Sequence, residues 1–331
     1  MPLIIGHRGA PGYLPEHSRG SYLRAIRAGV DAVEPDVVPS KDGVLVVRHE
    51  NEIGSTTDVS RRPEFAARRT TRAVDGEELT GWFTEDFTAE ELRTLRCRER
   101  LPAIRPDSAT HDDTEPVLLL RDVLQLARDG GVGVVLEIKH AAYFARRGFD
   151  MAELVRAELA EAGWGDAERS LVIESFEPLV LARLRDSGIP HPLVQLVEAE
   201  GAPWDLRERD GDDATPYAAM LTPAGLDALA EEVGGISTDK RLILDPDARG
   251  RARGPARFVE EARDRGLRVF AWTCRPENAF LLPGFRGDGG PADPGDYRGE
   301  WGVLRAAGLD GVFVDHPDLG VEFFRGGGAG A

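Results

Sequence analysis

Short apolar runs alternate with amphipathic segments along the whole chain. The runs that predict β-strands cover residues 3–7, 31–37, 44–49, 133–139, 171–176, 193–197, 235–238, 268–273 and 311–315. Between the later runs, apolar residues recur at helical spacing. Three of these segments begin with Pro and are followed by Gly, as helix ends favour, namely 178–187, 223–233 and 255–265. Strands that alternate with helices in this way indicate parallel βα units.

The strand count is one too high for a closed barrel of eight parallel strands. The turn Ser40-Lys41-Asp42-Gly43 is too short to hold the crossover helix that a parallel connection requires. We therefore predict that 44–49 returns as the second strand of a hairpin over the barrel mouth. The expected fold class is α/β, a (β/α)8 TIM barrel.

Residues 51–115 fit neither the strand nor the helix pattern, because Arg, Glu, Thr and Asp dominate and only 84–96 carries weak helical signals. This segment directly follows the hairpin, so we expect an insertion that caps the mouth. The Gly-rich residues 326–331 predict a disordered tail, which leaves 1–325 as a single barrel domain.

Charge and composition exclude some partners. With a formal net charge of -17 over 331 residues, the chain lacks the basic excess that nucleic acids and anionic membranes bind. It also lacks an apolar run of membrane-spanning length. The opening residues show no export signal, which predicts a cytoplasmic protein, or a secreted one if a signal has been trimmed. Cys97 and Cys274 form no disulfide framework, and the oligomeric state stays open.

Carboxylates gather at strand ends, where such barrels carry their catalytic groups. Glu34 and Asp36 are two residues apart on one strand, so both point into the barrel, and Glu137 and Lys139 repeat this geometry on the next barrel strand. Buried carboxylates repel one another unless a cation lies between them. The three acids predict a hard oxygen site for Mg²⁺ or Ca²⁺. In the alternative interpretation, Lys139 simply neutralises them.

Two histidines can reach the same mouth, His7 from the first strand and His49 from the end of the hairpin. A pair of imidazoles can divide acid and base roles near neutral pH, and Arg8 can bind phosphate through two hydrogen bonds. No His-x-His pair, Gly-x-Gly-x-x-Gly motif or P-loop is present, which argues against amidohydrolase-type and nucleotide-binding barrels. The remaining strand ends contribute Glu174, Phe176, Trp272, Asp315 and His316.

These motifs resemble the glycerophosphodiester phosphodiesterase family, whose pattern is His-Arg, then Glu-x-Asp, then His. Here the pattern reads His7-Arg8, Glu34-Pro35-Asp36 and His49-Glu50, and it continues through Glu137-Ile138-Lys139, Ser175-Phe176, Ala271-Trp272-Thr273 and Phe313-Val314-Asp315-His316-Pro317. His17 replaces a frequent Asn, and Glu50 replaces a more common Asp. The first change and the insertion resemble the periplasmic-type branch, and the role of Glu50 is left open.

The resemblance implies a role for each matching residue. His7 and His49 would be the acid–base pair, and the other implied roles are metal binding for Glu34, Asp36 and Glu137, phosphate binding for Arg8 and Lys139, and lining of the alcohol pocket for Phe176 and Trp272. The implied reaction is metal-dependent hydrolysis of glycerophosphodiesters, such as glycerophosphocholine or glycerophosphoethanolamine. A 2-hydroxyl beside the phosphodiester could attack internally, which would give a cyclic phosphate before sn-glycerol 3-phosphate and an alcohol are released.

Two other functions remain open at this point. The same barrel and metal could act on lysophospholipids or teichoic-acid-like polymers, if the insertion shapes a longer groove. A non-catalytic protein that binds a phosphate ligand is the other alternative. The presence of both His7 and His49 argues against it, because binding alone requires neither.

Overall fold

A closed barrel of parallel strands occupies the centre of the computed structural model, which describes residues 1–166, 168 and 170–326. Within this part of the chain, eight strand positions form the barrel: β1 (Leu3–His7), β2 (Ala32–Glu34) continued by β3 (Asp36–Pro39), β7 (Gly133–Ile138), β8 (Leu171–Ser175), β9 (Leu193–Val197), β10 (Gly235–Asp239), β11 (Arg268–Cys274) and β12 (Gly311–Val314). Pairing of β2 with both β1 and β7 closes the ring. The predicted (β/α)8 barrel is confirmed. Of the predicted tail 326–331, residues 327–331 lie outside the described residues.

The second barrel position differs from the expected single strand 31–37, because Pro35 divides it into β2 and β3. Proline has no N–H to donate to a neighbouring strand. Its carbonyl still accepts a hydrogen bond of 3.0 Å from the Glu137 N–H, so the wall stays closed. β4 (Leu45–Val47) pairs antiparallel with β3, which confirms the predicted hairpin.

Strand alternation sorts the barrel interior into two layers. The lower layer is apolar, and we call it the apolar floor: Ile5, Ala32, Val135, Val172, Val194, Phe270 and Phe313. Two residues further along the same strands, the side chains facing the same way are His7, Glu34, Glu137, Glu174, Leu196, Trp272 and Asp315. The chemistry-bearing side chains therefore lie directly above the floor.

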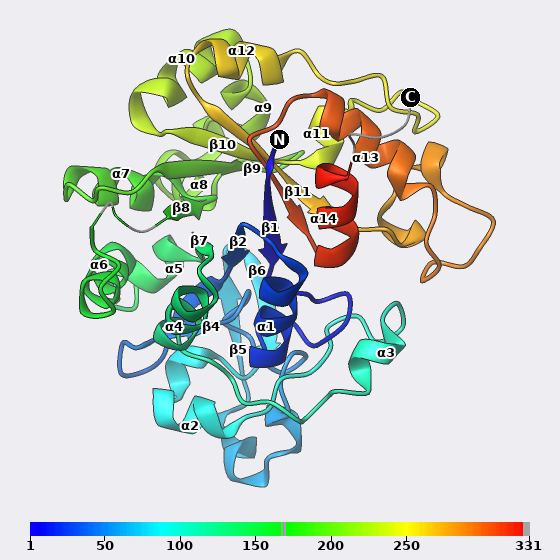
Figure 1. Ribbon diagram of the computed structural model, residues 1–331. Helices are drawn as coiled ribbons and strands as arrows, with labels where there is room; N and C mark the ends of the chain where they lie inside the picture. Colours follow the sequence, from blue (N-terminus) through cyan, green and yellow to red (C-terminus); the bar gives the residue numbers. More distant parts are fainter. Residues whose placement is uncertain (167, 169, 327–331) are drawn as a thin grey trace.

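Helices surround the barrel and bury their apolar faces against it (Figure 1). They are α1 (Arg19–Ala28), α4 (Leu120–Gly130), α5 (Ala141–Ala145), α6 (Met151–Glu161), α7 (Pro178–Asp186), α8 (Trp204–Asp210), α9 (Tyr217–Met220), α10 (Pro223–Glu232), α11 (Lys240–Leu244), α12 (Phe258–Asp264), α13 (Tyr297–Ala306) and α14 (Pro317–Arg325). Of these described helices, none is both long and apolar enough to cross a membrane.

Two of the three helices with Pro and Gly signals begin at the expected residue, α7 and α10. The third, α12, begins at Phe258 and not at Pro255. The Ala256 N–H donates a 2.9 Å hydrogen bond to the Ile243 carbonyl, which ties this segment to α11 and delays the first helical turn.

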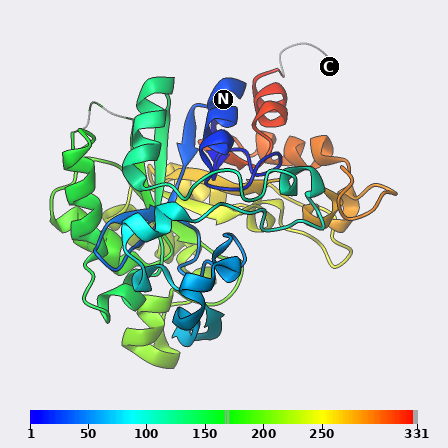
Figure 2. The same cartoon turned by 90° about the horizontal axis from the view of Figure 1, so that it is seen from below.

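The insertion 51–115 contains β5 (Thr70–Val74), β6 (Glu77–Gly81), α2 (Ala89–Thr94) and α3 (Pro106–Ala109), with 3-10 turns at Val59–Arg61, Pro63–Arg68 and Thr84–Asp86. The sequence pattern did not indicate the β5–β6 hairpin. Phe65, Phe87, Leu92 and Leu95 form an apolar cluster with residues of the adjoining chain. The insertion lies at the end of the barrel toward which the β1 arrowhead points in Figure 1, and Figure 2 shows it in front of the barrel from that side.

The tip of the β5–β6 hairpin rests on the barrel rim. Asp75 lies 2.5 Å from Nδ1 of His140, which follows β7. A Cβ at the neighbouring Gly76 would lie 2.7 Å from the Trp204 ring, so only glycine allows this approach. The hairpin is thus fitted against the loops beside the barrel mouth.

Candidate active site

A cavity of about 540 Å³ opens above the apolar floor, at the carboxyl ends of the strands. Eight of the nine residues singled out from the sequence line it: His7, Arg8, Glu34, His49, Glu137, Lys139, Phe176 and Trp272. The ninth, Asp36, is fully buried beside Glu34 and Glu137. His7 and Trp272, which are 265 positions apart in the chain, therefore share one cavity.

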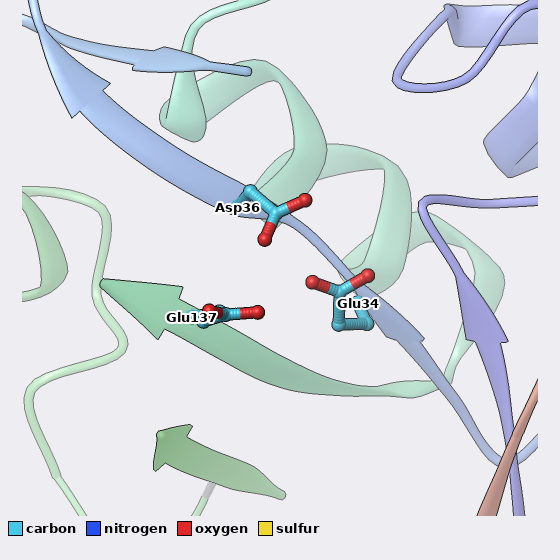
Figure 3. Close-up of side chains that lie close together, drawn as sticks. All are labelled: Glu34, Asp36 and Glu137. Carbon is cyan, nitrogen blue, oxygen red and sulfur yellow. The ribbon is translucent and has the colours of Figure 1, made fainter. Parts of the chain in front are cut away.

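Three carboxylates converge in this cavity (Figure 3). One oxygen from each of Glu34, Asp36 and Glu137 lies within 4.8 Å of the others, and all three side chains are buried. The backbone N–H of Arg8 donates a 2.8 Å hydrogen bond to Glu34 Oε2, whereas Glu34 Oε1 has no hydrogen-bond partner. The His17 ring contacts Asp36, and its Nε2 lies 2.9 Å from Asp36 Oδ2. A buried oxygen without a partner, aimed at two other carboxylates, is a free ligand position for a cation.

The charges around these oxygens also fit a divalent cation. Burial and Asp36 raise the pKa of Glu34 well above its usual value, and burial raises the pKa of Glu137 to about 8. Burial and Glu137 likewise raise the pKa of Glu174. Only Asp36 has a lowered pKa, because Lys139 and Arg8 outweigh its burial. Burial thus opposes ionisation of three of these four carboxylates. With all four ionised, their charge would exceed that of the two cationic side chains by two, which a bound Mg²⁺ or Ca²⁺ would balance.

Lys139 and Arg8 both contact the carboxylates. Lys139 Nζ lies 2.5 Å from Glu137 Oε1 and 3.2 Å from Asp36 Oδ1. Arg8 Nε lies 3.2 Å from Asp36 Oδ2, and its Nη1 lies 3.1 Å from Glu16. These contacts match the ion-pair interpretation of Lys139. Both cations nevertheless line the cavity, so each also lies within reach of an anion bound there.

His7 is oriented by an acid at the end of the neighbouring strand β12. Its Nδ1 lies 2.6 Å from Asp315 Oδ1. Arg275 and Arg105 outweigh burial and hold the pKa of Asp315 well below its usual value. An ionised carboxylate only accepts, so Nδ1 carries the hydrogen and Nε2 keeps a free lone pair. Burial and Arg8 lower the pKa of His7 to about 4, so the ring is neutral at pH 7 and can accept a proton.

His49 repeats this arrangement. Its Nδ1 lies 2.6 Å from Glu50 Oε1, and Arg100 binds both Glu50 oxygens at 2.6 Å. Burial, Arg8 and Lys139 lower the pKa of His49 to about 3. Glu50, whose role the sequence left open, thus orients a histidine and is not part of the three-carboxylate cluster. The cavity contains two neutral imidazoles, each with a carboxylate on Nδ1.

Phe176 and Trp272 form an apolar wall of the cavity. Their ring centroids lie 5.8 Å apart, nearly perpendicular to one another, and Lys139 Nζ is 5.4 Å from the centre of the Phe176 ring. The ring of Tyr217 packs against Phe176, with the two ring centroids 6.3 Å apart. This wall offers aromatic faces to the part of a ligand next to the charged groups.

Several residues of the site received no role from the sequence. Asp315 was noted only as a strand-end acid. Because a closed barrel makes the first and last strands neighbours, Asp315 could have been placed beside His7 from the sequence. Glu16, Arg100 and Arg105 carry no such signal, because they lie in irregular segments whose folding no periodicity reveals.

Both cysteines, Cys97 and Cys274, are free and buried, as expected.

Comparisons with known proteins agree on one family. The model of the glycerophosphoryl diester phosphodiesterase family matches residues 7–319. A glycerophosphodiester phosphodiesterase of Arabidopsis thaliana, GDPD6, is 31% identical over 95% of this chain and 83% of its own length. The enzyme of the same name from Treponema pallidum is 27% identical over 97% of this chain and 91% of its own length.

Solved structures share the fold. A putative glycerophosphoryl diester phosphodiesterase from Silicibacter pomeroyi superimposes with a TM-score of 0.67 at 23% identity, over 98% of this chain and 94% of that chain. A phosphodiesterase from Oleispira antarctica, in complex with the product sn-glycerol-3-phosphate, gives a TM-score of 0.63 at 18% identity, over 98% of this chain and 97% of that chain.

Proposed function

The chain belongs to the glycerophosphoryl diester phosphodiesterase family and is a phosphodiester hydrolase, and from this premise we propose that it cleaves glycerophosphodiesters to sn-glycerol 3-phosphate and an alcohol by metal-assisted acid–base catalysis. The observation that carries this proposal is the presence of two carboxylate-oriented imidazoles, His7 and His49, in the cavity that also contains the cluster of Glu34, Asp36 and Glu137. Each histidine side chain contributes a nitrogen that its carboxylate leaves free for proton transfer.

The two histidines divide the proton transfers. One imidazole accepts the proton of the substrate 2-hydroxyl, whose oxygen forms a bond to phosphorus while the bond from phosphorus to the leaving alcohol breaks. The other imidazole enters the step protonated on Nε2, the form that the bound phosphodiester anion favours, and donates that proton to the leaving alcohol. Water then opens the cyclic phosphate with the two roles reversed, which restores both rings. Internal attack is favoured because the hydroxyl is held beside the phosphorus at a high effective concentration.

Cationic groups stabilise the negative charge that grows on phosphorus. Arg8 and Lys139 line the cavity, and the phosphate would lie beside them. A divalent cation bound by Glu34, Asp36 and Glu137, Ca²⁺ or Mg²⁺, would supply further positive charge and polarise a phosphate oxygen. The sn-glycerol-3-phosphate bound to the Oleispira relative supports this choice of substrate.

The leaving alcohol lies against the aromatic wall of Phe176 and Trp272. Such faces accept the methylene and ammonium groups of choline or ethanolamine, which supports glycerophosphocholine and glycerophosphoethanolamine as substrates.

A release assay tests the proposal. Purified enzyme is incubated with glycerophosphocholine, glycerophosphoethanolamine, lysophosphatidylcholine and a poly(glycerol phosphate) polymer, with and without chelator, and then with added Ca²⁺ or Mg²⁺. We expect release of sn-glycerol 3-phosphate from the two small diesters, its loss in chelator, and its recovery with metal. Cleavage of only the lysophospholipid or the polymer would reassign the substrate class, and unchanged turnover in chelator would remove the metal from the mechanism.

A further inference from the structure

Arg100, from the insertion, connects two acidic residues of the active site. Its Nη1 and Nη2 each lie 2.6 Å from an oxygen of Glu50, and its Nε and Nη2 lie 2.8 and 2.5 Å from the oxygens of Glu16. Glu50 orients His49, and Glu16 pairs with Arg8. A single guanidinium therefore contacts the partner of a catalytic histidine and the partner of a phosphate-binding arginine.

Arg105, five residues further along the same segment, contacts the carboxylate partner of the other catalytic histidine. Its Nη2 lies 2.6 Å from Asp315 Oδ2, and its Nε lies 2.8 Å from Glu277. The side chain is 5% exposed, and the ring of Phe280 lies 5.7 Å from the guanidinium. Arg105 is thus fixed by two buried acids and an aromatic cover, and together with Arg275, whose Nε lies 2.7 Å away, it holds the oxygen of Asp315 that His7 leaves free.

We propose that Arg100 and Arg105 are positioning residues, through which the insertion sets the tautomer and direction of both catalytic imidazoles. This inference rests on the proposed function of His7 and His49. Neither arginine touches the reacting atoms. Each acts by fixing a carboxylate, which in turn keeps the hydrogen on Nδ1 and the lone pair on Nε2 of its histidine. The insertion is then part of the catalytic apparatus and not only a cover over the mouth.

The two arginines differ in a way that can be measured. Arg105 reaches only the acid that orients His7, together with Glu277, so its loss should lower kcat and leave KM unchanged. Arg100 also holds Glu16, which pairs with Arg8, so its loss should lower kcat and raise KM. A purely structural role would give no such distinction.

The same segment offers a matched control. Arg98 lies in the insertion between Cys97 and Arg100, but its guanidinium pairs with Asp112 and Asp113 at 3.2 and 3.4 Å, away from both histidines. Arg98→Met therefore removes an arginine and its ion pairs without touching either orienting carboxylate.

The experiment compares Arg100→Met, Arg105→Met, their Lys counterparts and Arg98→Met in the full-length, metal-loaded enzyme with glycerophosphocholine as substrate. We expect kcat to fall about 10- to 100-fold in each Met variant at position 100 or 105, because positioning groups contribute less than the proton-transfer groups themselves. KM should rise only for Arg100→Met. Lys at either position should restore part of kcat, and Arg98→Met should behave like the wild type.

Imidazole ¹⁵N chemical shifts report the tautomer independently of turnover. We expect Arg105→Met to move His7 from the Nδ1–H form toward a mixture with Nε2–H while His49 is unchanged, and Arg100→Met to do the reverse. The double variant Arg105→Met/Asp315→Asn should lose much less kcat than the product of the two single losses, because both substitutions act through the orientation of His7.

Unchanged tautomers in Arg100→Met and Arg105→Met, or equal losses in the Arg98→Met control, would overturn the inference. Should a Met variant fail to fold, its Lys variant decides: a folded Lys variant with wild-type kcat and wild-type tautomers also overturns it. If the wild type releases no sn-glycerol 3-phosphate, the proposed function fails, and the tautomer shifts still show whether the arginines position the rings.

Discussion

His7 Nδ1 and Asp315 Oδ1 lie 2.6 Å apart, although 308 positions separate the two residues in the chain. The contact joins the ends of the first and last barrel strands, which pair in parallel. The position of His7 therefore depends on closure of the barrel.

Asp315→Asn should lower kcat by about 10² to 10⁴ with little change in KM, because an amide donor facing Nδ1 favours the wrong tautomer of His7. Steady-state kinetics on glycerophosphocholine measure this. Asp318→Asn, which changes an acid that accepts a hydrogen bond from the exposed Tyr13 hydroxyl, is the control and should leave kcat unchanged. A fully active Asp315→Asn enzyme would rule out Asp315 as the orienting group.

His7→Ala and His49→Ala should each lower turnover by about 10² to 10⁴ while substrate still binds, because each ring transfers a proton in the proposed reaction. The double variant should lose much less than the product of the two single losses, since the rings act as a unit. Binding is followed calorimetrically with the inactive variants. Strictly multiplicative losses would mean that the histidines serve separate steps.

A substrate analogue without the 2-hydroxyl of glycerol should bind and scarcely be cleaved, because the internal nucleophile is missing. Competition against glycerophosphocholine measures its affinity, and release of the alcohol measures its cleavage. Rapid cleavage would show that water attacks phosphorus directly, and the cyclic phosphate would then be abandoned.

Glu34→Gln and Glu137→Gln should weaken binding of Ca²⁺ or Mg²⁺ by 10-fold or more, since each removes one of three converging carboxylates. Metal should raise the melting temperature of the wild type and have a smaller effect on both variants. Calorimetric titration gives the affinities. Glu198→Gln changes a carboxylate that lines the cavity outside the cluster, and it should bind metal like the wild type.

Glu16→Gln should reduce the free energy of unfolding at pH 7 by about 3 kcal/mol, because Arg100 and Arg8 lose a buried partner. Those two arginines outweigh burial and hold the pKa of Glu16 well below its usual value. A carboxyl with a lowered folded-state pKa stabilises the protein above about pH 4 and loses this contribution as the pH falls below that value.

Urea unfolding between pH 2.5 and pH 7 tests this pH dependence of the stability. The wild type should lose stability more steeply than Glu16→Gln below about pH 4. Glu64→Gln, which removes an exposed partner of Arg62, should follow the wild-type curve. Parallel curves for the wild type and Glu16→Gln would show that Glu16 has an ordinary pKa.

The regular part of the site was open to prediction from the sequence, and the irregular part was not. Glu34, Asp36 and Glu137 could be placed because strand alternation points residues two apart into the same barrel. The antiparallel course of β4 followed from a turn too short for a helix. In both cases a rule that depends only on neighbouring residues determines the local structure.

Arg100 and Arg105 follow no local rule. Their segment has no periodicity, and its path is determined by ion pairs with Glu16, Glu277 and Asp315, which come from loops and strand ends far away in the chain. The β5–β6 hairpin was missed for a similar reason, since its strand residues are mostly polar and its tip contacts the barrel rim. Segments that fold on a surface already formed leave little trace in their own sequence.

The apolar floor also has a consequence for the order of events. Ile5, Phe270 and Phe313 are at most 2% exposed, so neither ions nor small polar molecules pass through the barrel axis. Whatever enters must leave by the same opening. In the proposed reaction the alcohol separates from phosphorus when the cyclic phosphate forms, before water attacks. The alcohol must therefore leave through that opening first, and the space that it vacates becomes the route by which water reaches the cyclic phosphate.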